Sequence, residues 1–255
     1  MRKLTQILSW ISMVGAVVII VLVQLGEKSV QETAEQAENS AATTQPTPQG
    51  ATSGLVSISI RGGKPLYIGT PKDVKVDGPV EQPRKADEPR RPFLAPPGTV
   101  NLAAKRPVTS SEVEPIIGSL ELVTDGDKEG TGDSYVELGP GSQWVQIDLG
   151  TASQIWGISI WHYHGDPRVY KDVVVQVSDD ANFINGVMTV YNNDHDGSSG
   201  FGVGKALMYF ESHEGKLIET NGQVKGRYVR LYSRGSTAAD ENRYIEVEVY
   251  GIAGK

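Results

Sequence analysis

The chain contains no cysteine, and its 255 residues include only four histidines, four tryptophans and four phenylalanines. Without cysteine there can be no disulfide, no thiolate metal site and no cysteine nucleophile. This absence says nothing against export, because oxidising compartments permit disulfides without requiring them. Basic residues are in the minority, and the formal net charge of −7 argues against a broad phosphate-binding surface. We therefore expect no nucleic-acid partner.

The longest apolar run lies near the N-terminus. Residues 7–25 form 19 consecutive uncharged positions, about enough for a helix to cross the ~30 Å hydrocarbon core of a membrane. A cleaved signal peptide is the alternative, but it would have a shorter run and a small-residue cleavage signal, which "GEKSVQE" does not provide. Arg2 and Lys3 precede the run, so the positive-inside rule places the N-terminus in the cytoplasm. We expect residues 1–26 to be a transmembrane anchor and the rest to be extracytoplasmic.

The region from 27 to 97 is poor in apolar residues. Residues 27–53 are mainly Gln, Glu, Ala, Thr and Pro, which bury too little apolar area to offset their ordering entropy, so we expect a disordered stalk. "LVSISI" and "PLYIGTP" flank "RGG" and could form a short hairpin at 55–70, docked on the main domain because a lone hairpin is marginal in water. Proline and charge then return, so we interpret residues 27–97 as a flexible linker.

From residue 98 to residue 255 the sequence consists of short strand-like runs separated by turns. In "WVQIDLG" the apolar residues occupy alternate positions, and "IWGISIWHYH" repeats the pattern with Trp156, Ile158 and Ile160. "DVVVQVSDD", "ALMYF", "GRYVRLYS" and "YIEVEVYG" continue it. Closely spaced strands without long helical periods predict an all-β sandwich or barrel.

Several motifs in this region occur in the order and spacing of one known family: "NLAAKRPVTSS", "DGD", "WVQIDLG", "IWGISI", "VVVQVSDD", "GRYVRLYS" and "IEVEVYG". Residues 101–251 resemble the discoidin, or coagulation factor 5/8 type C, domain, and are similar to a carbohydrate-binding module family with the same galactose-binding-like fold. The resemblance implies an eight-stranded jelly-roll β-sandwich with ligand-binding loops at one end, and often a structural calcium ion. Two segments depart from it, since "DGDKEGTGDSYVEL" is longer and has Tyr135 in place of a tryptophan, and residues 191–222 are longer than in most members.

The segment "WHYHGDPRVY" holds two of the four histidines. A glycan ligand needs an aromatic face against its ring and planar polar groups that pair with its hydroxyls, and related carbohydrate modules combine aromatic, His, Arg and Asn residues in this way. "GDP" favours a turn after the strand, and "DENRY" adds two more polar groups before the last strand. We predict a ligand site formed by His164, Arg168, Tyr170, Asn242 and Arg243. The alternative is that Arg168 pairs with Asp166 and that Asn242 makes a turn.

His162 has the same strand parity as Ile158 and Ile160, so we expect it to point toward the core as a hydrogen-bonded structural residue. A transition-metal site on His162 and His164 would need a third ligand, such as His195 or Asp194. A nucleophile–histidine–acid triad has little support, because no serine lies in a recognisable nucleophile elbow.

Two acidic loops, "DGDKEGTGD" and "NNDHDG", have the carboxylate spacing of calcium loops. Neither is an EF-hand, because valine (Val136 and Val203) occupies the position of the bidentate glutamate and no helices flank the loops. In the first loop, the resemblance supplies a distant carboxylate, since Glu246 matches the calcium-ligating glutamate of the family. We predict a structural Ca²⁺ site formed by Asp125, Asp127, Thr131 and Glu246. The second loop, with Asn192, Asp194 and Asp196, is the weaker candidate.

These observations together predict a membrane-anchored, extracytoplasmic discoidin-like domain that binds a carbohydrate without catalysis. The first alternative is a protein–protein adhesion or scaffold module in a cell-envelope complex, and the second is a hydrolase subunit. The fold alone does not decide between them, because the function of such domains resides in their loops.

Overall fold

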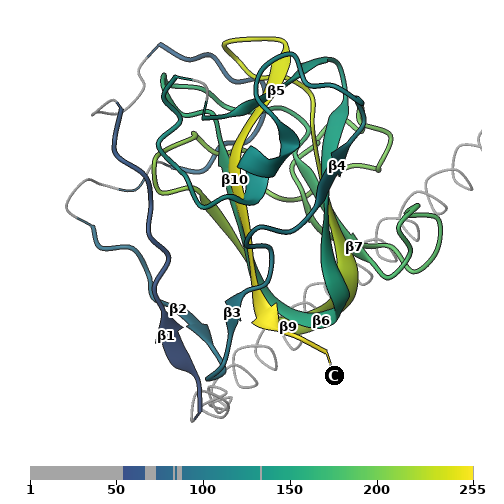
Figure 1. The fold of residues 1–255 in the computed structure, drawn as a ribbon. Coiled ribbons are helices and arrows are strands. Elements are labelled where there is room, and N and C mark those ends of the chain that lie inside the picture. The colour runs from purple at the N-terminus through teal and green to yellow at the C-terminus, as the bar shows by residue number, and fades with distance from the viewer. Residues whose placement is uncertain (1–53, 67–72, 83, 85–87, 133, 255) are drawn as a thin grey trace, which may run out of the picture. The chain divides into compact units, whose positions relative to one another are not determined.

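The computed structural model describes residues 54–66, 73–82, 84, 88–132 and 134–254, which belong to one compact unit that begins at Gly54. Ten strands make up this part of the chain (Figure 1). They are β1 (Val56–Ile58), β2 (Phe93–Ala95), β3 (Val100–Asn101), β4 (Val108–Ser110), β5 (Val136–Pro140), β6 (Gln143–His162), β7 (Val174–Ser178), β8 (Met188–Asn192), β9 (Lys216–Ser233) and β10 (Glu241–Ile252). Within the same described ranges, the one helical element is the 3₁₀ helix η1 (Leu120–Thr124). The prediction of an all-β domain is therefore confirmed.

The two longest strands, β6 and β9, bend in the middle and so belong to two layers. Their pairing register shifts between Asp148 and Ser153, beside Gly150, whose φ of +85° suits glycine. In the first layer, residues 143–148 of β6 pair with residues 228–233 of β9. On the outer sides of this pair, β4 pairs with β6 and β7 pairs with β9, and β8 pairs with β7 at the edge. In the second layer, residues 153–160 of β6 pair with residues 216–226 of β9. The other side of β6 pairs with β10, and β10 also pairs with β3 and β5. This is the arrangement of a β-sandwich.

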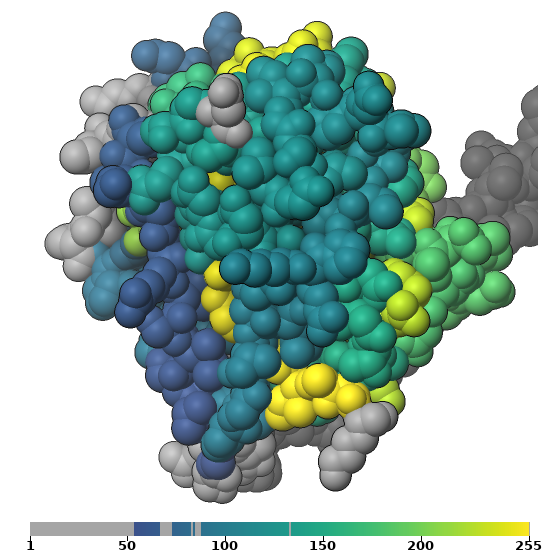
Figure 2. Space-filling model, viewed as in Figure 1, coloured from purple at the N-terminus to yellow at the C-terminus, as the bar shows by residue number. Residues whose placement is uncertain are grey.

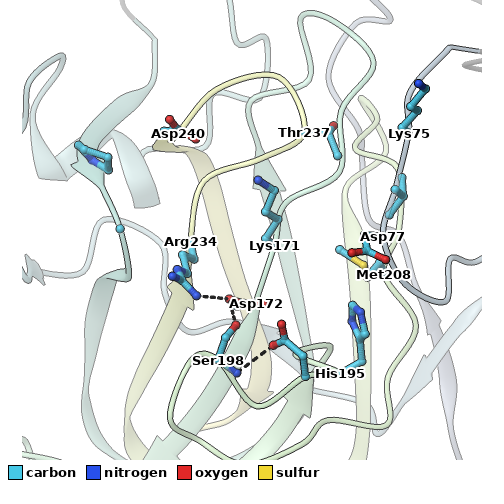
Figure 3. Close-up of a pocket in the computed structure, with 14 residues that line it drawn as sticks. Lys75, Asp77, Lys171, Asp172, His195, Ser198, Met208, Arg234, Thr237 and Asp240 are labelled. Atoms are coloured by element: carbon cyan, nitrogen blue, oxygen red, sulfur yellow. Dashed lines mark hydrogen bonds and ion pairs between the residues drawn. The ribbon is translucent and has the colours of Figure 1, made fainter.

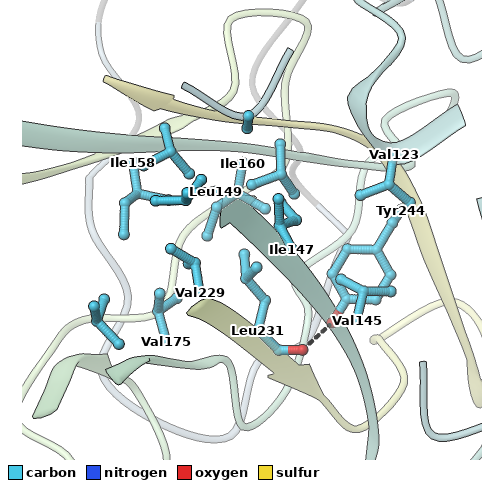
Figure 4. Close-up of a cluster of buried hydrophobic side chains, with 14 of the residues drawn as sticks. Val123, Val145, Ile147, Leu149, Ile158, Ile160, Val175, Val229, Leu231 and Tyr244 are labelled. Carbon is cyan, nitrogen blue, oxygen red and sulfur yellow. Dashed lines mark hydrogen bonds between the residues drawn. The ribbon is translucent and has the colours of Figure 1, made fainter. Parts of the chain in front are cut away.

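The core lies between the two layers (Figure 4). The alternating apolar residues of β6 predicted from the sequence face it, and Val145, Ile147, Ile158 and Ile160 are all 0% exposed. β9 contributes its own alternating apolar residues from the facing strand. The period-2 pattern thus identified the buried face of both long strands.

Part of the chain before residue 98 packs on the sandwich instead of acting only as a linker. β1 pairs with β2, and Figure 1 draws the two side by side near β3. Phe93 is 3% exposed, and its ring meets that of Tyr250 at 5.6 Å, edge to face. Gly157 leaves room for Phe93, because a Cβ there would lie 2.8 Å from Cζ of the Phe93 ring. In Figure 2 this segment lies in blue against the yellow C-terminal strand.

The compact unit therefore starts earlier than the predicted domain boundary at residue 98. In the structure, residues 56–58 pair with β2. The predicted hairpin at 55–70 would instead pair them with residues 65–71, most of which lie outside the described ranges. No helix in the described part of the chain is both long and apolar enough to cross a membrane. The predicted anchor at residues 1–26 and stalk at 27–53 lie outside that part and stay predictions.

Candidate functional site

Two loops distant in sequence are joined at the end of the sandwich opposite the bend in β6 and β9. The backbone N–H of Lys171 donates to the carbonyl of Gly235 (3.0 Å), and that of Arg234 donates to the carbonyl of Lys171 (2.9 Å). Tyr170 and Ser236 add an isolated antiparallel bridge. These bonds fix the loop before β7 against the loop after β9, so the side chains between them have defined positions.

Asn242, at the start of β10, connects a third turn to these two loops. Its Oδ1 accepts hydrogen bonds from Ser233 Oγ (2.7 Å) and the Gly235 N–H (2.8 Å). Its Nδ2 donates to the carbonyls of Gly139 (2.8 Å) and Gly141 (3.0 Å). The side chain is 0% exposed and uses both of its donors, so Asn242 holds the turns together and is not available to a ligand.

A pocket of about 720 Å³ lies among these turns (Figure 3). Residues 140–141, 171–172, 195–198 and 234–240 line it, and residues 75–77 form the remaining wall. Its lining is mostly polar, and its charged side chains are the cations Lys75, Lys171 and Arg234 and the carboxylates Asp77, Asp172, Asp196 and Asp240. The volume lies within the range of about 300–1,000 Å³ typical of small-molecule sites.

Two carboxylates that line the pocket, those of Asp172 and Asp196, lie close to a third, the buried Asp194. Single oxygens of Asp172, Asp194 and Asp196 lie within 4.8 Å of one another. Asp172 accepts a hydrogen bond from Ser198 Oγ (3.0 Å) and pairs with Arg234 at 3.6 Å. Burial raises the pKa of Asp172, and the hydrogen bond from Ser198 only partly offsets this effect.

Asp194 organises the loop that carries this cluster. Its Oδ1 accepts the N–H groups of Gly197 (2.8 Å) and Ser198 (3.2 Å), and its Oδ2 accepts the N–H and hydroxyl of Ser199. Burial acts to raise the pKa of Asp194, but the hydrogen bonds outweigh burial and lower it to about 2. Both oxygens are thus engaged within the loop, which fits a structural role in the "NNDHDG" segment.

Three of the predicted ligand residues lie beneath the surface. His164, Arg168 and Tyr170 are 1%, 2% and 1% exposed. His164 Nε2 bonds to the carbonyl of Lys128 (3.0 Å), and Arg168 Nε donates to Asp166 (2.7 Å), as in the alternative interpretation of the sequence. These side chains support the loops, because their burial leaves little surface for a ligand to contact.

The fifth predicted residue, Arg243, belongs to a cluster of guanidinium and tyrosine groups. Its Nε donates to Glu137 (2.5 Å), and its guanidinium carbon lies 5.4 Å from the centre of the Tyr163 ring. The Arg168 guanidinium lies 4.7 Å from the same ring, and Tyr135 packs edge to face against it at 5.1 Å. Arg243 is partly exposed, and its guanidinium group and that of Arg168 both lie against the Tyr163 ring.

His162 is confirmed as a structural residue. Its Nδ1 lies 2.8 Å from Glu211 Oε1, with both side chains 0% exposed, and its ring stacks on Tyr170 at 4.3 Å between centroids. Among the described residues, the one group of three potential metal-ligating side chains is the aspartate cluster described above. His162, His164 and His195 therefore do not come together as the ligands of a transition metal.

Of the predicted calcium ligands, the structure joins Glu246 to the "DGD" loop. Glu246 Oε2 accepts the Gly126 N–H (3.1 Å), while Oε1 is buried without a hydrogen-bond partner in the described residues. Burial raises the pKa of Glu246 to about 9. Asp125, Asp127 and Thr131 are exposed in the same loop. A buried carboxyl group with an unused oxygen has the chemistry of a calcium ligand, but the carboxylate oxygens of Asp125, Asp127 and Glu246 are not all within 4.8 Å of one another in the structure.

The pocket residues Lys171, Asp172 and Arg234 were missed from the sequence. Each stands next to a predicted strand, where a charged residue is ordinary, and only the pairing of two distant loops brings them together. The one sequence signal was the glycine- and serine-rich turn "RGSTAAD", which marks a loop at the same end as "DPRVYKD".

Loops at one end of a β-sandwich are a common place for ligand-binding sites. The family model of the F5/8 type C domain matches residues 107–248. This chain belongs to that family. Among curated proteins, none matches it.

Several solved structures are similar to the chain at low identity. Chitosan-binding module 1 of a chitosanase/glucanase from Paenibacillus sp. IK-5 is 19% identical, with a TM-score of 0.40, covering 60% of this chain and 99% of that one. A fucose-binding module from Streptococcus pneumoniae is 19% identical, with a TM-score of 0.43, covering 59% and 97%. A family 89 glycoside hydrolase from Clostridium perfringens is 19% identical, with a TM-score of 0.44, and the match spans 60% of this chain but 15% of the hydrolase. At these scores the similarity does not extend to ligands or residue roles.

Proposed function

We propose that this chain is a membrane-anchored carbohydrate-binding protein, that it acts without catalysis outside the cytoplasm, and that its ligand occupies the pocket at the loop end. The observation that carries the proposal is the pocket itself, where turns from four distant parts of the chain place polar side chains around a volume of about 720 Å³. Family membership makes such a loop-end site the expected place for a ligand, and a jelly-roll connection of the eight sandwich strands belongs to the same proposal.

The chemistry of the pocket suits a polyhydroxylated ligand. Lys171 and Asp240 are exposed and line the pocket, and neither side chain is paired within the described residues. Thr237 adds a half-buried hydroxyl group, and Ser198 an exposed one. Charged groups and hydroxyls of this kind form hydrogen bonds with vicinal sugar hydroxyls, and the half-buried Val76 offers apolar surface to the ring.

The absence of catalysis in this proposal rests on membership of the F5/8 type C family and on the sequence, in which no serine lies in a recognisable nucleophile elbow.

A structural calcium ion is part of the proposal. Asp125, Asp127, Thr131 and Glu246 would hold it, and the ion would supply the positive charge that the buried Glu246 carboxylate lacks. The support is the unused Oε1 of Glu246 and its contact with the Gly126 amide.

The membrane anchor at residues 1–26 and the location in the cell envelope rest on the sequence alone. They make a glycan of the envelope or its surroundings the accessible ligand. A protein partner in the envelope remains the alternative, and the binding test distinguishes the two.

Replacing Lys171 tests the site. Lys171→Ala removes an exposed ammonium from the pocket, and losing a hydrogen bond to a charged group costs about 1.5–3 kcal/mol, or roughly ten- to a hundredfold in affinity. We would screen the wild type on a glycan array of neutral, uronate and glucosamine oligosaccharides and measure the best binder by calorimetry. Lys225→Ala, an exposed lysine near the bend in the strands, is the matched control and should bind normally. An array without hits, or equal affinity in the two variants, would refute the proposed site.

A further inference from the structure

One wall of the pocket comes from the chain before the F5/8 type C region. Residues 75–81, here called the strap, precede the matched residues 107–248. The strap places Lys75, Val76 and Asp77 in the lining, opposite the turns that carry Lys171 and Asp240 (Figure 3). The pocket described above is therefore incomplete without a segment that the family domain itself does not contain.

Main-chain hydrogen bonds hold the strap along the loop that follows β8. The Met208 N–H donates to the carbonyl of Pro79 (2.9 Å), and the Glu81 N–H donates to the carbonyl of Met208 (2.8 Å). Val80 and Met208 form an isolated parallel bridge. Met208 is only 4% exposed, although its side chain lines the pocket. The strap thus pairs with the chain beside the pocket through a single short bridge, much less than a full strand of a sheet.

Two further contacts fix its position, and both are easily weakened. Gly78 has φ +142° and lies against the His195 ring, so a Cβ there would be 2.3 Å from the ring carbon Cε1. Glu81 pairs with Lys216, but the Glu81 side chain is 41% exposed, and such exposed pairs contribute little and weaken with salt. A glycine contact, a short bridge and a partly exposed ion pair are the attachments of a segment that can undock locally.

From these contacts we propose that the strap is a detachable wall of the pocket, so that the chain upstream of the domain controls access to the site. When docked, the strap covers Met208 and adds the charges of Lys75 and Asp77 to the lining. When undocked, it leaves the pocket open on that side while the sandwich stays folded, because none of the core residues belongs to it. The proposal builds on the pocket as the ligand site, but its test needs no ligand.

The absence of cysteine permits a direct test with single engineered thiols in the full chain. Met208→Cys places a thiol under the strap, and Ser198→Cys places one in the same pocket at an exposed residue away from it. The probe is N-ethylmaleimide, and the measured quantity is the labelling rate of each thiol. We expect the thiol at 208 to react at least about tenfold more slowly than the thiol at 198, because it reacts only when the strap opens.

Gly78→Ala should release the strap. We expect it to raise the labelling rate at position 208 by about tenfold, because the added methyl group pushes the strap away from the His195 ring. The rate at 198 should stay within about twofold, because Asp194 holds the backbone of residues 197–199 in place. Gly98→Ala is the matched control, since Gly98 also has positive φ (+89°) but no atom within 4 Å of an added Cβ. Glu81→Gln is a second, milder route, which removes one charge of the ion pair and preserves the shape of the side chain.

The outcomes separate the strap from the binding function. Slow labelling at 208 that Gly78→Ala or Glu81→Gln accelerates, with Gly98→Ala inert, supports the detachable wall. Equal rates at 208 and 198 in the otherwise unchanged chain would show that the strap is not docked, and a slow rate that neither variant changes would show that it does not detach. Either result overturns the inference. A glycan array without hits would refute only the proposed ligand.

Discussion

At the scale of single residues, the same polar side chain can hold a turn or bind a ligand, and burial distinguishes the two. Asn242 was predicted to bind a ligand because it lies in a loop beside Arg243. In the structure its amide joins the turns at Gly139, Gly141 and Gly235, with no exposed surface. Its contribution to any binding site is thus to position the turns.

Asn242→Ala should therefore reduce stability first. It leaves the buried Gly139 carbonyl and the buried Gly235 N–H without partners, and each unsatisfied group costs about 1–3 kcal/mol, so we expect a loss of several kcal/mol in the free energy of unfolding. Urea unfolding measures it, with Asn182→Ala in an exposed loop as the control, expected to change stability by no more than about 0.5 kcal/mol. Weaker glycan binding at unchanged stability would instead restore Asn242 as a ligand contact.

Glu246 should make stability depend on pH and on calcium together. Burial raises the pKa of its carboxyl group from 4.5 to about 9, so the folded state binds its proton more tightly than the unfolded state. Without a cation, its stabilising contribution is complete below pH 4.5 and is lost as the pH rises toward about 9. Calcium favours the ionised form, so millimolar calcium should raise the melting temperature above pH 7 by several degrees relative to excess chelator.

Glu246→Gln should abolish both effects, since the amide does not titrate and is a poorer calcium ligand. Glu219→Gln, an exposed glutamate on β9, is the control and should behave as the wild type. We would record melting curves of the three proteins from pH 5 to 9 with calcium and with chelator. If chelator leaves the melting temperature of the wild type unchanged at every pH, the loop holds no structural calcium.

Sequence alone could predict which way a residue points but not what it meets. The parity of the strand placed His162 inward, and it is buried. Its partner Glu211 lies 49 positions away in an irregular segment, so no local pattern marks the pair. The pocket shows the same limit, because Asp172 and Arg234 become neighbours only through long-range backbone pairing.

At the scale of elements, alternation of apolar residues identified the long strands, and it failed where a strand is short or at an edge. β7 and β10 coincide with predicted runs, and β6 joins the two runs "WVQIDLG" and "IWGISIWHYH" into one strand. β9 contains the predicted run "GRYVRLYS" but begins ten residues earlier, at Lys216. "ALMYF" was expected to be a strand, but it forms only the bridge of Met208 with Val80. β8, "MTVYN", was missed, because this edge strand has no fully buried residue to give it a clear period.

β2 shows how a short element can matter through one side chain. Phe93 fills the space left by Gly157 and packs on Tyr250, so Phe93→Ala should remove about 3 kcal/mol of stability by leaving a cavity. Leu94→Ala in the same strand is the control, because Leu94 is 38% exposed and should change stability by about 0.5 kcal/mol or less. Chemical unfolding of the two variants measures the difference. Equal and small losses would mean that β2 does not dock on the sandwich in solution.

At the scale of the whole molecule, the composition of residues 27–97 predicted a flexible linker with a possible short hairpin at 55–70, yet the compact unit begins at Gly54. Proline- and charge-rich sequence has little apolar area of its own, but a few contacts suffice to dock it on a surface that already exists. Phe93 supplies an apolar contact, Arg84 pairs with Glu214, and Arg90 donates to the Glu214 carbonyl (2.8 Å). Composition describes a segment alone and does not include the surface of a neighbouring domain.

Proteolysis of intact cells that express the protein tests the proposed anchor and the domain boundary in one experiment. If residues 1–26 span the membrane and the domain lies outside, proteinase K added to intact cells should release a soluble fragment. Residues 27–53 are the expected cutting region, because their composition predicts an unfolded stalk and proteases cut preferentially in such segments. Contacts within the compact unit hold the described residues from Gly54 onward, so the N-terminus of the released fragment should lie between residues 27 and 54. A cytoplasmic protein that stays intact is the control for cell integrity.

A fragment that begins near residue 98 would show that β1, β2 and the strap do not stay docked. A mature chain that begins just after Leu25 before any protease is added would show that the apolar segment is a cleaved signal.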